Sequence, residues 1–390
     1  MTASKDGALD AGSLMAEAQA LTRLEDFGQP QFIAGLEALV ASIEAEAALT
    51  EAGLAAQRQR LRGLLVNRLR IEQALREHPQ IRNERIDAPL VIVGLPRTGS
   101  TLTHRLLASD PAHTAMRWWE GRYPAMLPGE RRGEPTERRA LGRAEVEAVV
   151  AASPDAMRIH PWDFDGADEE VLLIEHSFHS TVPEAHMHLP SYSRWVEAQD
   201  HVPAYRDLLA CLQYLQWQTP ERAGKRWVLK SPHHLGYLDA LLRVFPDAKI
   251  IQTHRNPHET VPSFCSMCAS LAAPLTRKPN GQSIGAHWAA KLSRNLQASA
   301  AVAARQPSSF IDLRFRDLIH DPIAEMRRLY AFIDRSFDTR AQRAMQAYRQ
   351  DDAYQTNAHH YRLADYGLSE GRIDALFGAY MAHYGLGKGR

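Results

Sequence analysis

The segment of this chain with the clearest chemistry is Gly94-Leu95-Pro96-Arg97-Thr98-Gly99-Ser100-Thr101. It follows a short apolar run and precedes residues with helical spacing, which predicts a turn from a strand to a helix. Backbone N–H groups of such a turn converge on one point, and the helix N-terminus adds about half a positive charge there. Arg97 can grip an anion with two hydrogen bonds. Hydroxyl donors are Thr98, Ser100 and Thr101. We expect an anion cradle, with an ordinary structural turn as the alternative.

The turn differs in one position from the triphosphate-binding loop G-x-x-x-x-G-K-[ST]. Gly94 and Gly99 have the required spacing, but Ser100 stands where that loop has a lysine. The lysine reaches the β- and γ-phosphates, and magnesium neutralises much of the remaining charge. Its absence argues against a triphosphate. It favours a shorter anion, such as one phosphate carrying a further group, which needs no metal.

Two further cationic residues follow apolar runs that are typical of strands. Lys230 ends one run, and Arg255 ends another, with Ser263 eight positions later. Open α/β sheets bind ligands at the carboxyl ends of their strands. We therefore expect Lys230 to direct its ammonium into the same crevice as the turn, where it can stabilise developing negative charge. Arg255 and Ser263 are expected to clasp a second phosphate. The alternative for Arg255 is a salt bridge with Asp247 or Glu259.

These residues need alternating strands and helices to position them. Short continuous apolar runs, typical of strands buried on both faces, occur at 90–93, 227–229, 248–251 and 310–315. Helical spacing occurs between or after them. Such alternation predicts a parallel sheet with right-handed crossovers. We therefore expect an α/β fold with a P-loop-type parallel sheet flanked by helices.

Two regions lie outside this alternation. The N-terminal part has helical spacing, and we expect a helical region, residues 1–86, packed on an α/β domain of residues 87–390. Residues from about 112 to 225 have no strong strand signal apart from 171–174, which predicts a largely helical insertion. The segment 271–285, with its prolines and glycines, is predicted to be a loop, either a lid or ordinary surface.

The composition excludes several classes of protein. The 390 residues hold 46 Lys and Arg against 46 Asp and Glu, so no net charge attracts nucleic acid. Only Cys211, Cys265 and Cys268 are present, which indicates a reducing compartment. The last two have CxxC spacing, but no second pair completes a zinc site, so we expect no metal. The amino terminus lacks the regions of a signal peptide, and no apolar run approaches about 18 residues. We expect a cytoplasmic protein without a transmembrane segment.

Two motifs together resemble those of a known family. They are VGLPRTGSTLTHRLLASDP, residues 93–111, and WVLKSPHHLGYLDALLRVFPDAKIIQTHRNPHETVPS, residues 227–263. Both are similar to the sulfotransferases that use 3′-phosphoadenosine 5′-phosphosulfate (PAPS), in particular the bacterial branch related to tyrosylprotein sulfotransferases. The resemblance extends from about residue 89 to residue 330.

This resemblance implies roles for individual residues. It implies that the turn Arg97-Thr98-Gly99-Ser100-Thr101 holds the 5′-phosphosulfate, and that Arg255 and Ser263 hold the 3′-phosphate. Lys230 is expected to contact the bridging oxygen and the sulfonate. Glu120 falls where related enzymes place the glutamate that takes the proton from the acceptor hydroxyl. PAPS needs no magnesium in this family, which agrees with the missing lysine.

We therefore expect an in-line displacement, with Glu120 as general base and with Lys230, Arg97 and the loop amides stabilising charge. A histidine of the insertion is the alternative base. The candidates are His176, His179, His186 and His188. Aromatic and apolar residues near Glu120 favour a small-molecule or lipid-like hydroxyl acceptor, with simple core packing of these residues as the alternative. Two other functions stay open, a P-loop kinase or nucleotidase and a catalytically silent nucleotide-binding scaffold. The apolar faces of the N-terminal helices predict either packing within the chain or a homodimer.

Overall fold

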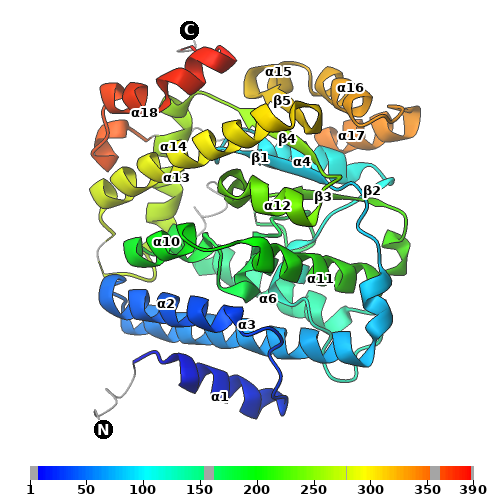
Figure 1. Cartoon of the computed structure of the whole chain (residues 1–390), viewed down its shortest axis with the longest axis vertical. Helices are drawn as coiled ribbons and strands as arrows, with labels where there is room; N and C mark the ends of the chain where they lie inside the picture. The colour runs from blue at the N-terminus through cyan, green and yellow to red at the C-terminus, as the bar shows by residue number, and fades with distance from the viewer. Residues whose placement is uncertain (1–7, 153–161, 278, 352–360, 388–390) are drawn as a thin grey trace.

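A five-stranded parallel sheet lies at the centre of the fold, in the order β2-β3-β1-β4-β5 (Figure 1). The computed structural model describes residues 8–152, 162–277, 279–351 and 361–387. The strands are β1 (Leu90–Gly94), β2 (His113–Thr114), β3 (Arg226–Lys230), β4 (Lys249–His254) and β5 (Phe310–Arg314). The four predicted strands and the α/β fold class are confirmed, and β2 is a short addition at the edge beside β3.

Helices surround this sheet and make up most of the described chain. Those before β3 are α1 (Ala11–Thr22), α2 (Gln31–Glu46), α3 (Glu51–Glu77), α4 (Ser100–Ser109), α5 (Trp118–Arg122), α6 (Thr136–Ala152), α8 (Val171–Ile174), α9 (Val182–His186), α10 (Pro190–Glu197) and α11 (Val202–Gln218). Those after β3 are α12 (Leu238–Val244), α13 (Pro257–Ala272), α14 (Gly281–Arg305), α15 (Phe315–His320), α16 (Pro322–Phe332), α17 (Thr339–Asp351) and α18 (Glu370–Tyr384). None of the helices in the described ranges is both long and apolar enough to cross a lipid bilayer.

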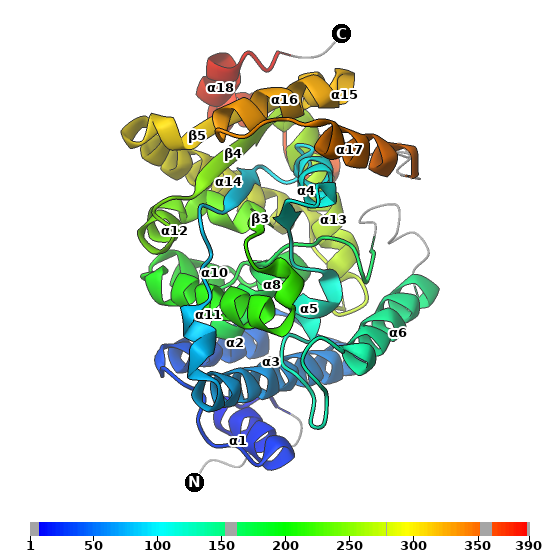
Figure 2. The ribbon, with the colours of Figure 1, turned by 90° about the vertical axis from the view of Figure 1, so that its right-hand side faces the viewer.

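The two faces of the sheet bury different side chains of the same strand, because successive residues of a strand point to opposite faces. Leu90 and Ile92 of β1 join a core with α4, α15, α16 and α17. Val91 and Val93 join a larger core with α11, α12, α13 and α14. Figure 2 shows α4 beside α17 on the first of these faces. Both faces are therefore covered, as the continuous apolar runs predicted.

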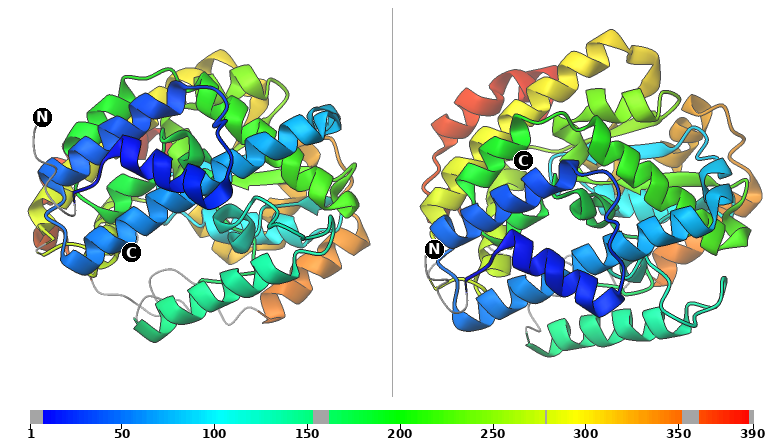
Figure 3. Two further views of the ribbon diagram at one scale, coloured as in Figure 1. Left: turned by 90° about the horizontal axis from the view of Figure 1, so that it is seen from below. Right: turned by 60° about the horizontal axis from the view of Figure 1, so that its bottom comes forward.

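The N-terminal helices form a layer of their own at one end of the molecule. In the left panel of Figure 3, which shows the molecule from below, α1, α2 and α3 lie nearest the viewer. Helix α2 packs on α10, and α3 packs on α11. Leu61, Leu65 and Leu69 of α3 pack in a core with α1, α2 and α10. Ile71 and Leu75 of the same helix join the core of the sheet. Helix α3 thus contributes to both cores and fixes the helical layer on the sheet.

The structure refines two expectations for the connecting segments. Residues 171–174, which carry the one strand signal of the predicted helical insertion, form helix α8, in which the N–H of Ile174 donates to the carbonyl of Glu170. A short apolar run fits a buried helix as well as a strand, and periodicity alone cannot separate the two. The loop predicted at 271–285 is shorter, because α13 ends at Ala272 and α14 begins at Gly281.

The connection after α13 is attached to the N-terminal layer. The N–H of Thr50 donates to the carbonyl of Leu275 at 2.9 Å, and the N–H of Arg277 donates to the carbonyl of Ala48 at 3.0 Å. A Cβ on Gly53 would lie 2.1 Å from the Leu275 carbonyl oxygen, so the start of α3 approaches this connection more closely than any other residue type permits.

Candidate active site

The turn between β1 and α4 lies at the carboxyl edge of the sheet, and Phe315 and Leu318 pack tightly against it. Gly99 precedes α4 with φ +87°, and Arg97 also has a positive φ, 72°. A Cβ on Gly99 would lie 2.8 Å from the ring of Phe315 and 3.1 Å from Leu318. Glycine is therefore required here. The first N–H groups of α4 have no acceptor within the helix, which is the arrangement that binds anions in other proteins.

The hydroxyl groups of the turn have different surroundings. Thr98 is fully buried, and its hydroxyl donates to the Leu95 carbonyl at 2.7 Å and shares a 2.6 Å hydrogen bond with Thr253 of β4. Its side chain therefore holds the turn on the sheet, and its hydroxyl is already used within the protein. Ser100 and Thr101 line the neighbouring cavity.

Lys230 ends β3 next to this turn, in register with Ile92 of β1. Its side chain is only 3% exposed, and Nζ lies 2.5 Å from Oε1 of Glu169 and 3.4 Å from Oγ1 of Thr101. A buried ammonium is stable only when it is paired and hydrogen-bonded, and Glu169 supplies the pair. The contact with Thr101 places this cation at the start of α4, beside the anion cradle.

A second glutamate fixes the backbone of Lys230. Oε2 of Glu170 accepts the N–H of Lys230 at 2.8 Å, and Oε1 contacts Nε2 of His234. Burial raises the pKa of Glu170, but His234 and the hydrogen bonds outweigh burial, so the pKa lies below its ordinary value. The end of β3 is thereby held in place, which fixes the direction of the Lys230 side chain.

Arg255 directly follows β4, on the other side of the turn. Its guanidinium donates to Oε2 of Glu259 at 2.6 Å and 2.9 Å, donates to the carbonyl of Arg97 at 3.3 Å, and lies 4.2 Å from the centre of the Phe315 ring. The predicted pairing with Glu259 therefore forms. Ser263 lies on α13 four residues after Glu259, on the same face of the helix. Residues that line the open hollow here include Arg255, Asn256, Arg314, Phe315 and Arg316.

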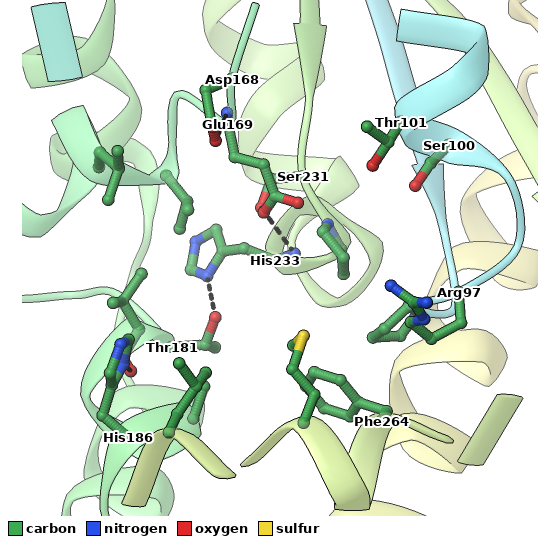
Figure 4. A pocket seen from close by; sticks show the side chains of 18 of the residues that line it. Arg97, Ser100, Thr101, Asp168, Glu169, Thr181, His186, Ser231, His233 and Phe264 are labelled. Carbon is green, nitrogen blue, oxygen red and sulfur yellow. Dashed lines mark hydrogen bonds between the residues drawn. The ribbon is translucent and has the colours of Figure 1, made fainter. Parts of the chain in front are cut away.

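A cavity with a volume of about 190 Å³ opens between the turn, the end of β3 and the insertion. Figure 4 shows Ser100, Thr101 and Arg97 on one side and Glu169 and Ser231 on the other. The remaining wall is mainly apolar. It includes Trp118, Trp162, Leu172, Phe264, Met267 and Trp288. Charged groups thus meet at one end of a cavity whose other surfaces suit a hydrocarbon.

Glu120, the general base predicted from the sequence, lies in a different environment. Its side chain is 3% exposed, and Oε2 accepts both a 2.7 Å bond from Arg222 and a 2.8 Å bond from the N–H of Arg117. The described residues that line the cavity include Trp118 but not Glu120. Glu120 therefore does not line the cavity with Arg97, and its carboxylate pairs with Arg222 and stabilises the start of α5.

The four histidines considered as alternative bases differ in their position relative to the cavity. His186 lines the cavity, with Nδ1 at 2.9 Å from the Val182 carbonyl. His176 is buried beside Asn67, and burial lowers its pKa to about 4. His179 and His188 contact Trp195 and His287 respectively, outside the lining of the cavity. Only His186 of this group is in reach of a cavity ligand.

The two cysteines with CxxC spacing are buried in the protein core. Cys265 and Cys268 lie on α13 and are buried, and burial raises the pKa of both thiols, that of Cys265 to about 12. Thiols with raised pKa values are poor nucleophiles and poor metal ligands. No group of three or more His, Cys, Asp or Glu side chains in the described ranges is arranged to hold a metal ion.

Comparison with known proteins shows the family of this chain. The model of the sulfotransferase family matches residues 89–339, more than half of the chain. The chain belongs to the sulfotransferase family. Its structure is similar to that of sulfotransferase STF1 from Mycobacterium tuberculosis H37Rv, with 33% sequence identity and a TM-score of 0.84 over 96% of this chain and 100% of that chain. Sulfotransferase STF9 from Mycobacterium avium has the same fold, with 23% identity and a TM-score of 0.88 over 100% of both chains.

A named relative of this sulfotransferase is the omega-hydroxy-beta-dihydromenaquinone-9 sulfotransferase Stf3 of Mycobacterium tuberculosis (strain CDC 1551 / Oshkosh). It is 24% identical over 321 residues, which cover 77% of this chain and 75% of the relative. The same protein in Mycobacterium bovis matches equally. These findings confirm the family predicted from the two motifs, and they do not favour a kinase or a silent scaffold.

Sequence reasoning missed several residues that line the cavity of this sulfotransferase. Glu169, Ser231 and His233 are examples. Ser231 and His233 follow Lys230 directly, so the rule that ligands bind beyond strand ends pointed to them. Glu169 lies 61 residues before Lys230 in the insertion, and no local pattern connects the two.

Proposed function

We propose that this sulfotransferase uses PAPS as donor and transfers its sulfuryl group to a hydroxyl of an apolar, lipid-like acceptor. The observation that supports it best is the position of three cations. Lys230 ends β3, Arg97 and Arg255 follow the neighbouring strands β1 and β4, and an apolar cavity opens beside Arg97 and the end of β3. Separate anionic groups and a hydrocarbon body thus find complementary surfaces at one edge of the sheet.

The turn and Lys230 would hold the sulfated end of the donor. PAPS supplies an activated sulfuryl group on a 5′-phosphate. The N–H groups at the start of α4, with Arg97, would bind the phosphosulfate, and Ser100 and Thr101 would donate hydrogen bonds to it. The Lys230 ammonium, 3.4 Å from Thr101, would stabilise the charge that develops on the phosphate oxygen. These groups are fixed before the reaction, which is what makes such stabilisation effective.

The 3′-phosphate would bind at Arg255 and Ser263. Arg255 now donates two hydrogen bonds to Glu259, whose side chain is 46% exposed. A phosphate carries more charge than this carboxylate and can accept the same fork of donors, so it can take the place of Glu259. The contact of Arg255 with the Arg97 carbonyl joins this grip to the turn.

The acceptor is proposed to be apolar because of the cavity wall and because of one relative. Aromatic and aliphatic side chains form most of that wall, and burying apolar surface there contributes roughly 25 cal/mol per Å². The relative Stf3 is named for a hydroxylated menaquinone derivative. With a volume of about 190 Å³, the cavity has room for the hydroxyl-bearing end of such a molecule rather than its whole length.

Calorimetry with 3′-phosphoadenosine 5′-phosphate (PAP), ADP and ATP tests the donor assignment. PAP should bind more tightly than ADP, and Arg255→Ala should weaken PAP binding by about 10- to 100-fold, since it removes hydrogen bonds to a charged group. Arg305→Ala is the matched control, because Arg305 pairs with Asp239 on the surface. Equal affinity of the wild type for all three nucleotides would refute the assignment.

Transfer from radiolabelled PAPS tests the acceptor class. A long-chain primary alcohol and an apolar phenol should become sulfated, and a sugar alcohol of similar hydroxyl content should not. Sulfation of the sugar alcohol in preference to the apolar acceptors would show that the apolar wall does not select the substrate.

A further inference from the structure

Two carboxylates line the cavity, and they differ in access. Asp168 is 8% exposed, its Oδ1 accepts the N–H of Glu169 at 2.6 Å, and burial raises its pKa. The side chain of Glu169 is 25% exposed. Figure 4 shows the Glu169 carboxylate beside Ser231, on the side of the cavity opposite Ser100 and Thr101. Glu169 is therefore the more accessible of the two carboxylates.

The contacts of Glu169 place it beside the predicted reaction centre. Oε1 lies 2.5 Å from the Lys230 ammonium, which itself lies 3.4 Å from Thr101 at the start of α4. Oε2 lies 3.3 Å from the hydroxyl of Ser231. The carboxylate is thus one side chain away from the anion cradle, and it borders the space where an acceptor hydroxyl would have to lie.

The other groups near this cavity are less suited to accept a proton. Burial, with the neighbouring His201, His234 and Lys291, holds the pKa of His233 well below its ordinary value. Figure 4 shows His186 on the part of the wall away from Ser100 and Thr101. Charged or titratable groups that line the cavity with Glu169, or contact it, are Asp168 from its own segment, Lys230 from β3, Arg97 from the turn, His186 from α9 and His233 after β3.

We propose that Glu169 is a catalytic residue, the general base of the transfer; the inference rests on the proposed function. The Glu169 carboxylate accepts the proton of the acceptor hydroxyl as the acceptor oxygen forms its bond to sulfur. The bond between sulfur and the 5′-phosphate oxygen breaks, and its electron pair leaves with PAP. The products are the sulfate ester, PAP and protonated Glu169, which returns its proton to solvent.

The pair of Glu169 with Lys230 suits this exchange of charge. Before transfer, the ammonium is balanced by the carboxylate at 2.5 Å. As Glu169 becomes neutral, negative charge grows on the departing phosphate, and Lys230 can balance it instead. The buried ammonium is therefore never left without a counter-charge, which avoids the cost of an unpaired charge.

Glu169→Gln tests the role, with Glu120→Gln and His186→Gln as parallel variants. Positioned acid–base catalysis contributes typically about 10²- to 10⁴-fold, so Glu169→Gln should lower kcat for an alcohol by that factor. PAP affinity should stay near the wild-type value, which also shows that the variant is folded. Glu120→Gln should keep the turnover of its folded fraction, and His186→Gln, which alters the cavity wall, should lose far less turnover than Glu169→Gln. Wild-type turnover in Glu169→Gln would overturn the inference.

Acidic acceptors separate a base from a residue that only positions Lys230. A nitrophenol is already ionised near neutral pH and needs no base, so Glu169→Gln should transfer to it almost as fast as the wild type. The acid limb of the wild-type pH profile for an alcohol should also disappear in the variant. An equal loss for alcohol and ionised phenol would refute the base role. A wild type that sulfates no hydroxyl at all would instead refute the proposed function.

Discussion

Glu120→Gln is expected to destabilise the fold while sparing the chemistry. Glu120 and Arg222 are 3% and 6% exposed, and a single carboxylate oxygen accepts the bond from Arg222 at 2.7 Å and the bond from the Arg117 N–H at 2.8 Å. The amide oxygen of glutamine can still accept, but the guanidinium loses its buried counter-charge. Removing one partner of a buried ion pair typically costs about 3–5 kcal/mol. We expect about 3 kcal/mol here because one hydrogen bond survives.

Urea unfolding followed by far-UV circular dichroism measures this loss. Asp239→Asn is the matched control, because Asp239 and Arg305 form an exposed pair, and such pairs contribute at most about 1 kcal/mol. Combining Glu120→Gln with Arg222→Met should cost less than the sum of the two single changes, since no buried charge is then left alone.

Turnover of the folded fraction decides between two accounts of Glu120. The structure predicts that Glu120→Gln keeps kcat and the acid limb of the pH profile. A variant that is as stable as the wild type, but has lost most of its turnover, would refute this reasoning and restore the role expected from sequence resemblance.

Two further predictions concern charge at the site and in the core. Lys230→Met should lower kcat by roughly 10²- to 10³-fold in the PAPS transfer assay, whereas Lys249→Met, at the opposite end of the sheet, should not; equal effects would contradict the role of Lys230. Burial lowers the pKa of His104 to about 3 and that of His176 to about 4. The unfolded chain therefore binds protons below pH 6.5 that the folded chain does not, so the free energy of unfolding should fall from about pH 7 to 4, by up to about 3 kcal/mol for His176. Urea unfolding across this range should be flatter for His176→Gln, and an unchanged slope would exclude His176 as a source.

The sheet and its turn could be predicted because their signals are local. Apolar runs of four to six residues marked β1, β4 and β5 to within a few residues, and the glycines of the turn marked the start of α4. A short apolar signal can mislead, as at 171–174, where the strand-like run belongs to helix α8. The site residues at strand ends could be named from the sequence because a parallel sheet brings all such ends to one edge.

The remaining parts of the site depend on contacts across long stretches of chain. Arg222 lies 102 residues after Glu120. The sequence around Glu120 therefore does not show that its carboxylate is paired. Glu169 faces Lys230 only because the insertion folds back over the carboxyl edge of the sheet. The hydrogen bonding of the Thr98 hydroxyl likewise depends on Thr253, which lies on β4. Burial and pairing of polar groups are tertiary properties, which local patterns do not encode.

The attachment of Leu275 to Thr50 has a consequence for any shortened form of this enzyme. Helix α13 carries Phe264 and Met267, two residues of the apolar wall, and the chain leaving that helix is hydrogen-bonded to the start of α3. A polypeptide beginning at residue 87 would keep the strands and the turn between β1 and α4 but would lack the helical layer that supports this wall. Such a fragment is expected to bind PAP but to bind the proposed apolar acceptor weakly, because the apolar wall would lose its support.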